Sequence, residues 1–134
     1  MLIVRPVSDP DESARLCLEY GRTPGSDVMA YHAVEAKDPD DGSPVSLGLC
    51  RFTLADGKDE ILSLDFAAGT HDAEAMIITA RAVMSFMHRC GVKTVYASDD
   101  IPDELIAPLG FGMTEGRLSL NLEEFYKSPC HYKP

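Results

Sequence analysis

Cysteine and histidine side chains have the widest chemical range in this sequence, because both can bind metals and thiols can also be oxidised. The cysteines lie 33, 40 and 40 residues apart, with no C-x-x-C pair: Cys17, Cys50, Cys90 and Cys130. This spacing favours reduced thiols over a disulfide framework. A metal site that joins Cys130 and His131 to His71 or His88 is the alternative, but the spacing gives it no support, and we predict that no metal is bound.

Acidic side chains dominate the charge of the chain. Its 22 Asp and Glu residues outnumber 12 Lys and Arg residues, and the formal net charge is −10 at pH 7. The basic residues are scattered, so no positive patch is apparent, and we predict neither nucleic acid nor a membrane as a partner. An acidic surface suits a cationic small molecule or a Lys-containing protein instead.

Length and composition indicate a single domain over residues 1–134. Apolar residues make up 45% of the chain and charged residues 25%, which is the balance of a globular protein with one core. No apolar run approaches the roughly 18 residues of a membrane span. The first residues lack the basic and apolar regions of a signal peptide, so we expect a cytoplasmic protein.

Hydrophobic periodicity predicts the strands and helices that must position the chemical groups. The expected strands are 1–7, 28–36, 45–54, 60–67, 92–98 and 117–122, and the expected helices are 11–20, 73–90 and a short one opened by residues 100–104. The turn at 55–58 makes an antiparallel hairpin of the strands that flank it. The tail from residue 123 has room for one helical turn.

Two of these elements carry the clearest patterns. In the helix at 73–90, an apolar stripe with 3.6-residue spacing predicts a side that faces the core: Met76, Ile77, Ala80, Val83, Met84 and Met87. Thr70 or Asp72 is expected to cap the start of this helix, and Gly91 is expected to end it. In the strand at 45–54, the apolar positions change phase, which predicts a bulge or bend near Leu49.

The element order and several short motifs together resemble the GNAT superfamily of acyl-CoA-dependent N-acetyltransferases. The matching segment is 62–111, and the element order extends the likeness loosely to the whole chain. The motifs are Leu64-x-Phe66, the long helix at 73–90, the strand that follows Gly91, and the triplet Leu109-Gly110-Phe111. The resemblance implies an α/β fold with a twisted, mostly antiparallel mixed sheet, helices on both faces and a central splayed pair of parallel strands.

The resemblance also implies acetyl-CoA as a co-substrate. Main-chain groups of Leu64 and Phe66 would pair with its pantetheine arm, and the amides of a phosphate loop would meet its pyrophosphate. The family's loop, of the type R-G-x-G-x-G, falls on His71-Asp72-Ala73-Glu74-Ala75-Met76. The family's glycines let bare N–H groups at a helix start approach phosphates closely. Here Asp72, Glu74 and Met76 stand at the glycine positions, and His71 stands at the basic position.

Acyl transfer to an amine needs a base that takes the ammonium proton and an acid that protonates the leaving thiolate. The resemblance makes Asp65 the candidate base, with Glu60 behind it. Family enzymes often use a Tyr as the acid, but the matching position here is Ile106, so Tyr96 is the candidate substitute. Asp65 also reads as a solvent-facing strand residue, and Tyr96 as a core residue.

The acceptor cleft implied by the resemblance lies where the two parallel strands splay apart, at the ends marked by Phe66 and Ala97. Tyr31 and His32, on an earlier strand, are candidates to line this cleft and bind the acceptor. Both also read as ordinary sheet residues, because their strand has apolar residues on each face.

Two functions of different classes fit these residues. One is an N-acetyltransferase that moves an acetyl group from acetyl-CoA to an amine of a small molecule or a Lys-containing protein. The other is a catalytically inactive GNAT-like module that has lost CoA binding and serves in binding, regulation or dimerisation, for example as a homodimer. Glu74, Met76 and Ile106 favour the second function, and the usual activity of the family favours the first.

Overall fold

The computed structural model describes residues 1–36, 43–55 and 57–127. The strands are β1 (Leu2–Val7), β2 (Val28–Glu35), β3 (Val45–Thr53), β4 (Glu60–Phe66), β5 (Thr94–Ala97), β6 (Gly112–Thr114) and β7 (Arg117–Asn121). The helices are α1 (Pro10–Glu19), α2 (Ala73–Arg89), α3 (Asp103–Leu109) and α4 (Leu122–Lys127). Every element that the sequence predicts is present, with bounds that differ by a few residues.

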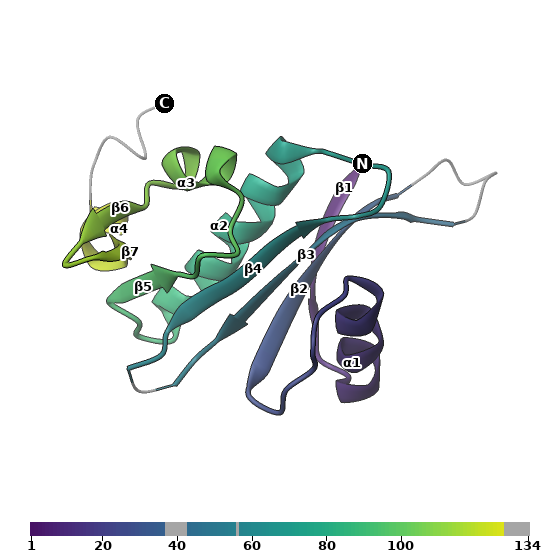
Figure 1. The fold of residues 1–134 in the computed structure, drawn as a ribbon, viewed down its shortest axis with the longest axis horizontal. Helices are drawn as coiled ribbons and strands as arrows, with labels where there is room; N and C mark the ends of the chain where they lie inside the picture. Colours follow the sequence, from purple (N-terminus) through teal and green to yellow (C-terminus); the bar gives the residue numbers. More distant parts are fainter. Residues whose placement is uncertain (37–42, 56, 128–134) are drawn as a thin grey trace.

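The strands form one mixed sheet in the order β1-β2-β3-β4-β5-β7-β6 (Figure 1). Neighbouring strands are antiparallel except β4 and β5, which run parallel at the centre. Helix α1 packs on one face of the sheet, and α2 and α3 cover the other. This arrangement confirms the predicted α/β class with a mostly antiparallel sheet and helices on both faces.

Helix α1 is fixed at its start and along its side. The side chain of Asp9 caps the helix, and Pro10 occupies its first position, where the missing N–H costs nothing. Buried Leu16 packs into a small apolar cluster against the sheet. Arg5 of β1 donates hydrogen bonds of 3.2 and 2.7 Å to the carboxylate of Glu12, which ties the helix to the edge of the sheet.

Helix α2 supplies the centre of the larger core. Its predicted apolar stripe faces the sheet, and five of its members are fully buried: Met76, Ala80, Val83, Met84 and Met87. They pack against the strands around Phe52 and Leu64, and Ile77 is partly buried at the margin. The helix ends before Gly91, whose φ of 91° is the left-handed conformation expected of a glycine that closes a helix.

The β3 strand bulges at Leu47, two residues before the expected position at Leu49. The reason lies in the close passage of β3 beneath α2. A Cβ atom on Gly48 would lie 2.2 Å from the Met76 sulfur and 2.6 Å from the main-chain oxygen of Asp65. The bulge brings a residue without a side chain to this point of contact.

The structure adds a strand, β6, and corrects the end of β7. All three residues of β6 are exposed, so the strand leaves no burial pattern in the sequence. Leu122 was expected to end the last strand, but it is the first residue of α4 and is fully buried. Its side chain is therefore buried because of its position in a helix, and not because it alternates with exposed residues in a strand.

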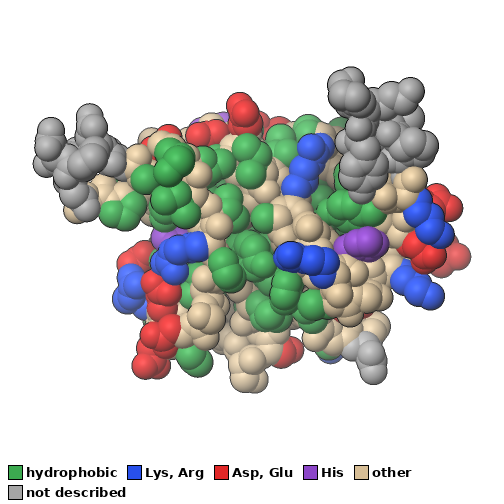
Figure 2. All heavy atoms as spheres, turned by 180° about the vertical axis from the view of Figure 1, so that it is seen from behind, with side chains coloured by type: hydrophobic (Ala, Val, Ile, Leu, Met, Phe, Trp, Pro, Cys, Tyr) green, Lys and Arg blue, Asp and Glu red, His purple; other side chains and the backbone are tan. Residues whose placement is uncertain are grey.

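The surface carries both apolar and charged regions. Figure 2 shows one face on which hydrophobic side chains occupy the middle, with Lys and Arg among them and Asp and Glu mostly near the borders. Within the described part of the chain, none of the helices combines the length and hydropathy that a membrane crossing requires.

Candidate active site

The parallel strands β4 and β5 separate after a short stretch of pairing. Their register joins Glu60 to Tyr96 and Ile61 to Ala97, and no further pair between these strands occurs among the described residues. Ser98 closes the paired part, because its amide donates to the Ile61 carbonyl at 3.1 Å and its hydroxyl donates to the next carbonyl of β4 at 2.5 Å. Strand β4 continues to Phe66, beyond the end of β5.

The splay leaves one edge of β4 open. The Ala67 amide faces β3, where it donates to the Leu47 carbonyl at 2.9 Å, and the pairing of β3 with β4 is regular from the pair of Gly48 and Phe66 to the pair of Arg51 and Ser63. Main-chain groups of successive strand residues point to alternate edges. The N–H and C=O groups of Leu64 and Phe66 therefore lie on the open edge, where an extended ligand can reach them.

Helix α2 begins beside this open edge, after the connection at 67–72. The carboxylate of Asp72 caps it by accepting a hydrogen bond of 3.0 Å from the Ala75 amide. The amides of Ala73 and Glu74 are in the first turn, where no carbonyl of the helix reaches them. The Met76 side chain does not stand at the helix start, because it is buried against Gly48.

His71 connects the two sides of the splay. Its ring stacks on Phe66 with a centroid distance of 4.0 Å, and its Nε2 lies 2.6 Å from a carboxylate oxygen of Glu104 in α3. The side chains of His71 and Glu104 are 62% and 48% exposed, and an ion pair this exposed contributes at most about 1 kcal/mol. A bound anion can therefore displace this contact at little cost.

Asp65 forms hydrogen bonds with Arg22, a residue that the sequence analysis did not select. Arg22, which follows α1, donates hydrogen bonds of 2.9 and 2.7 Å to the two carboxylate oxygens. The same guanidinium donates to Asp100 at 3.1 Å and so spans the splay on the α1 face. The hydrogen bonds that Arg22 donates to Asp65 raise the pKa of Arg22 above its usual value, and the guanidinium remains charged.

A polar cavity of about 590 Å³ opens next to Asp65. We call it the acidic cavity; it is lined by Glu19 and Tyr20 at the end of α1, Ser46 of β3, and residues 65–68. Glu19 also forms an exposed ion pair of 3.2 Å with Arg15. Among the described residues, the three carboxylates of Glu19, Asp65 and Asp100 form ion pairs with two guanidinium groups, those of Arg15 and Arg22, so negative charge is in excess in this set.

A chain of hydrogen bonds leads from the acidic cavity into the sheet. The Tyr20 hydroxyl lies 2.7 Å from the Ser46 hydroxyl, which lies 2.7 Å from Nε2 of His32. His32 is 7% exposed, and its Nδ1 has no hydrogen-bond partner among the described residues. Burial lowers the pKa of His32 below its usual value of 6.5, with a smaller effect from Arg5, so the imidazole is neutral at pH 7.

The structure does not bring the other expected residues together with Asp65. Glu60 is at the paired end of β4, where it lies 3.7 Å from Arg117. The Arg117 guanidinium also covers the ring of Tyr96, 3.9 Å from its centroid. Tyr31 faces α2, where it packs on Phe52, and is therefore on the opposite side of the sheet from His32.

Sequence reasoning missed Arg22, Ser46 and Tyr20. Arg22 is 43 residues from Asp65 in the chain, and Ser46 is 26 residues from Tyr20. Ordinary turn and strand residues carry no local signal of such contacts. The hairpin register would have indicated that Ser46 lies near the end of β4, because β3 pairs with β4 from Gly48 to Thr53.

The described residues offer no group of three or more His, Cys, Asp or Glu side chains that could hold a metal ion. Cys17, Cys50 and Cys90 are free thiols, and burial raises the pKa of Cys50 above its usual range. The candidate ligands Cys130 and His131 lie outside the described residues.

No protein-family model matches this sequence, and no curated protein does. Solved structures do match its fold. A protein of Desulfovibrio desulfuricans that is assigned to the GNAT acetyltransferases has a TM-score of 0.62 and 11% identity, with 91% of this chain and 99% of that chain covered. Aminoglycoside 6'-acetyltransferase type Ii has a TM-score of 0.59 and 13% identity, with 90% and 97% covered.

A third match was solved with coenzyme A bound. It is the E. coli protein YhhK, assigned as an N-acetyltransferase, with a TM-score of 0.58 and 16% identity over 90% of this chain and 97% of that chain. Likeness at such identities is a likeness of fold. The splayed parallel pair, the position of α2 and these matches together give one conclusion: this chain has the fold of the GNAT acetyltransferases.

Proposed function

We propose that this protein is an N-acyltransferase that moves an acetyl group from acetyl-CoA to a cationic amine. The observation that carries the proposal is the open edge of β4 at residues 64–66, which borders both the start of α2 and the acidic cavity. The donor and the acceptor of an acyl transfer must meet at one point, and this edge adjoins both candidate sites. A CoA-bound structure and an aminoglycoside acetyltransferase with the same fold support this assignment.

The donor would bind along the open edge and at the start of α2. The free main-chain groups of Leu64 and Phe66 can form hydrogen bonds with the amides of an extended pantetheine arm, as the main chain of one strand does with that of the next. The first-turn amides of Ala73 and Glu74 suit a pyrophosphate, helped by the helix dipole. Asp72 already caps this turn, so the phosphates must compete with its carboxylate, and we expect weaker binding than in a glycine-rich loop.

The acceptor would bind in the acidic cavity. Glu19 and Asp65 line this cavity, and Asp100 lies close to it. These three carboxylates outnumber the two arginines that contact them, Arg15 and Arg22. An ammonium group is attracted to such a site, and a polyamine or a Lys side chain has the required charge. Nucleic acid is disfavoured by the same charge and by the net charge of −10.

We assign proton removal to Ser46 and His32 rather than to Asp65 or Glu60. Both oxygens of Asp65 already accept hydrogen bonds from Arg22, which holds this carboxylate in place across the splay. The Ser46 hydroxyl lines the acidic cavity and contacts neutral His32 behind it. In the tautomer that leaves Nε2 free, Ser46 can take the ammonium proton while it passes its own proton to His32.

Release of free thiol from acetyl-CoA tests the proposal. The purified chain would be given acetyl-CoA with spermidine, small aminoglycosides or a Lys-containing peptide, and the product would be identified by mass. We expect amine-dependent thiol release, reduced about 100-fold in Ser46→Ala because its route to His32 is lost. Ser85→Ala, on α2 away from the acidic cavity, is the matched control and should keep native activity. Absence of thiol release with every amine would reject the proposal.

The second candidate is a non-catalytic module that does not bind CoA. It is favoured by the contacts that already occupy the splay, namely Arg22 between Asp65 and Asp100 on one side and His71 with Glu104 on the other. Ile106, partly buried at the position of the family's acid, also favours it. Binding measurements with acetyl-CoA separate the two candidates, because this module would show no saturable binding.

A further inference from the structure

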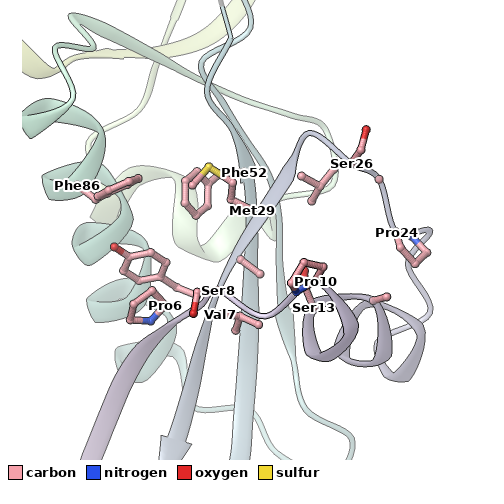
Figure 3. A pocket seen from close by; sticks show the side chains of 15 residues that line it. Pro6, Val7, Ser8, Pro10, Ser13, Pro24, Ser26, Met29, Phe52 and Phe86 are labelled. Carbon is pink, nitrogen blue, oxygen red and sulfur yellow. The ribbon is translucent and has the colours of Figure 1, made fainter.

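A second cavity lies apart from the splay and shares no lining residue with the acidic cavity. We call it the apolar cavity, and its volume is about 860 Å³. It lies where β1 has ended: Val7 pairs with Ala30, so residues 28 and 29 of β2 run past the end of β1. The space is bounded by the start of α1, the connection at 24–26 and an aromatic group (Figure 3).

The aromatic group gives the cavity a rigid apolar wall. Phe52 is fully buried, and its ring lies 5.7 Å from Tyr31 and 6.1 Å from Phe86, both in edge-to-face geometry. Figure 3 shows Phe52 and Phe86 on the side of the cavity toward α2, with Met29 beside Phe52. Met29 is 38% exposed, so part of its side chain remains accessible at the rim of the cavity.

The lining carries no charge. None of its fifteen residues is acidic, basic or a histidine, although charged residues make up 25% of the chain. Its polar groups are hydroxyls, from Ser8, Ser13 and Ser26 and from Tyr31. Burial raises the pKa of Tyr31, so this phenol also stays neutral.

We infer that the apolar cavity binds an uncharged, mainly aromatic or hydrocarbon small molecule that has a hydroxyl or carbonyl group. Its volume falls in the range of small-molecule sites, roughly 300–1,000 Å³. A charged ligand would lose its hydration without gaining a counter-ion. The net charge of −10 further disfavours an anion, and a cation finds better partners in the acidic cavity. The ligand is therefore a different molecule from the amine acceptor.

Three ligands of one shape test the inference: 1-naphthol, which is neutral at pH 7, the anion 1-naphthoate and the cation 1-naphthylmethylammonium. Each would be titrated into the full chain by calorimetry, and amide shifts would be followed by NMR. We expect saturable one-to-one binding of 1-naphthol, with shifts centred on residues 28–31 and Phe52. The two ions should bind at least about tenfold more weakly.

Two variants and a control locate the site. Ala14→Leu places a larger side chain in the cavity and should weaken 1-naphthol binding by at least about tenfold, whereas Ala107→Leu, at an exposed position of α3, should not. If Ala14→Leu does not fold, Met29→Gln at the exposed rim is the second variant and should weaken binding in the same direction. Three results would overturn the inference: no saturation, equal binding of the ions, or shifts centred on Glu19 and Asp65.

Discussion

Asp65 illustrates how one contact changes the chemistry of a side chain. The position of this carboxylate on the central strand made it the candidate base, but both of its oxygens accept hydrogen bonds from Arg22. Charge-assisted, two-pronged pairs of this kind are strong and fix the geometry of both groups. Asp65 therefore holds Arg22 across the splay, and we propose His32, reached through Ser46, as the proton acceptor in its place.

Gly48 leads to a prediction about stability. Gly48→Ala should lower the free energy of unfolding by about 1–3 kcal/mol, because the new methyl group would overlap the Met76 side chain and the main-chain oxygen of Asp65. Thermal unfolding measures the effect. Gly112→Ala is the control, since a Cβ there meets no atom within 4 Å. Equal melting temperatures for Gly48→Ala and the native chain would contradict this close contact.

His32 makes stability depend on pH. Above its usual pKa of 6.5, the imidazole is neutral in the folded and the unfolded chain. As the pH falls below that value, the unfolded chain takes up a proton first, because burial lowers the folded-state pKa. The free energy of unfolding should therefore decrease as the pH falls from 6.5, until the folded-state pKa is passed.

His32→Gln should remove this part of the pH dependence. Melting temperatures from pH 7.5 to 5 should fall less steeply in His32→Gln than in the native chain. His88→Gln, an exposed histidine on α2, is the matched control and should follow the native chain. Parallel losses in the native chain and in His32→Gln would show that burial of His32 does not govern the effect.

At the scale of the elements, we propose that the start of α2 contacts the phosphates of acetyl-CoA. Asp72→Ala removes a capping carboxylate, which should cost about 0.5–2 kcal/mol of stability, and it frees the Ala75 amide. Acetyl-CoA affinity should then rise, because a negative charge and a competitor for the amide are both lost. Asp9→Ala is the matched control: it removes the cap of α1 at a similar cost, but should leave CoA affinity unchanged. If CoA affinity fell or stayed equal in Asp72→Ala, the phosphates would not bind at this helix start.

Elements with strong local patterns could be predicted from the sequence, and contacts between distant segments could not. The apolar stripe of α2 follows from a helical period that tertiary contacts do not alter, and it is buried as expected. Strand β6 has three exposed residues and leaves no such pattern. The contact of Arg22 with Asp65 depends on how α1 is placed on the sheet, which no local period encodes.

At the scale of the whole molecule, two cavities of opposite character are supported by one sheet. The acidic cavity lies on the α1 face beside the open edge of β4, and the apolar cavity lies where β2 runs past β1. Their linings differ in charge and share no residue, so we assign them to two different ligands. The CoA site, in contrast, depends on the splay, and its existence decides between an enzyme and a non-catalytic module.

Calorimetric titration of acetyl-CoA into the full chain, together with the melting temperature, shows whether the CoA site exists. We predict saturable one-to-one binding that is tighter in Asp72→Ala than in the native chain. A ligand at 100 times its dissociation constant adds about 2.7 kcal/mol of stability, which raises the melting temperature by roughly 5–10 °C. Absence of heat and of any shift at millimolar acetyl-CoA, in both the native chain and Asp72→Ala, would contradict the account and leave a fold without its cofactor.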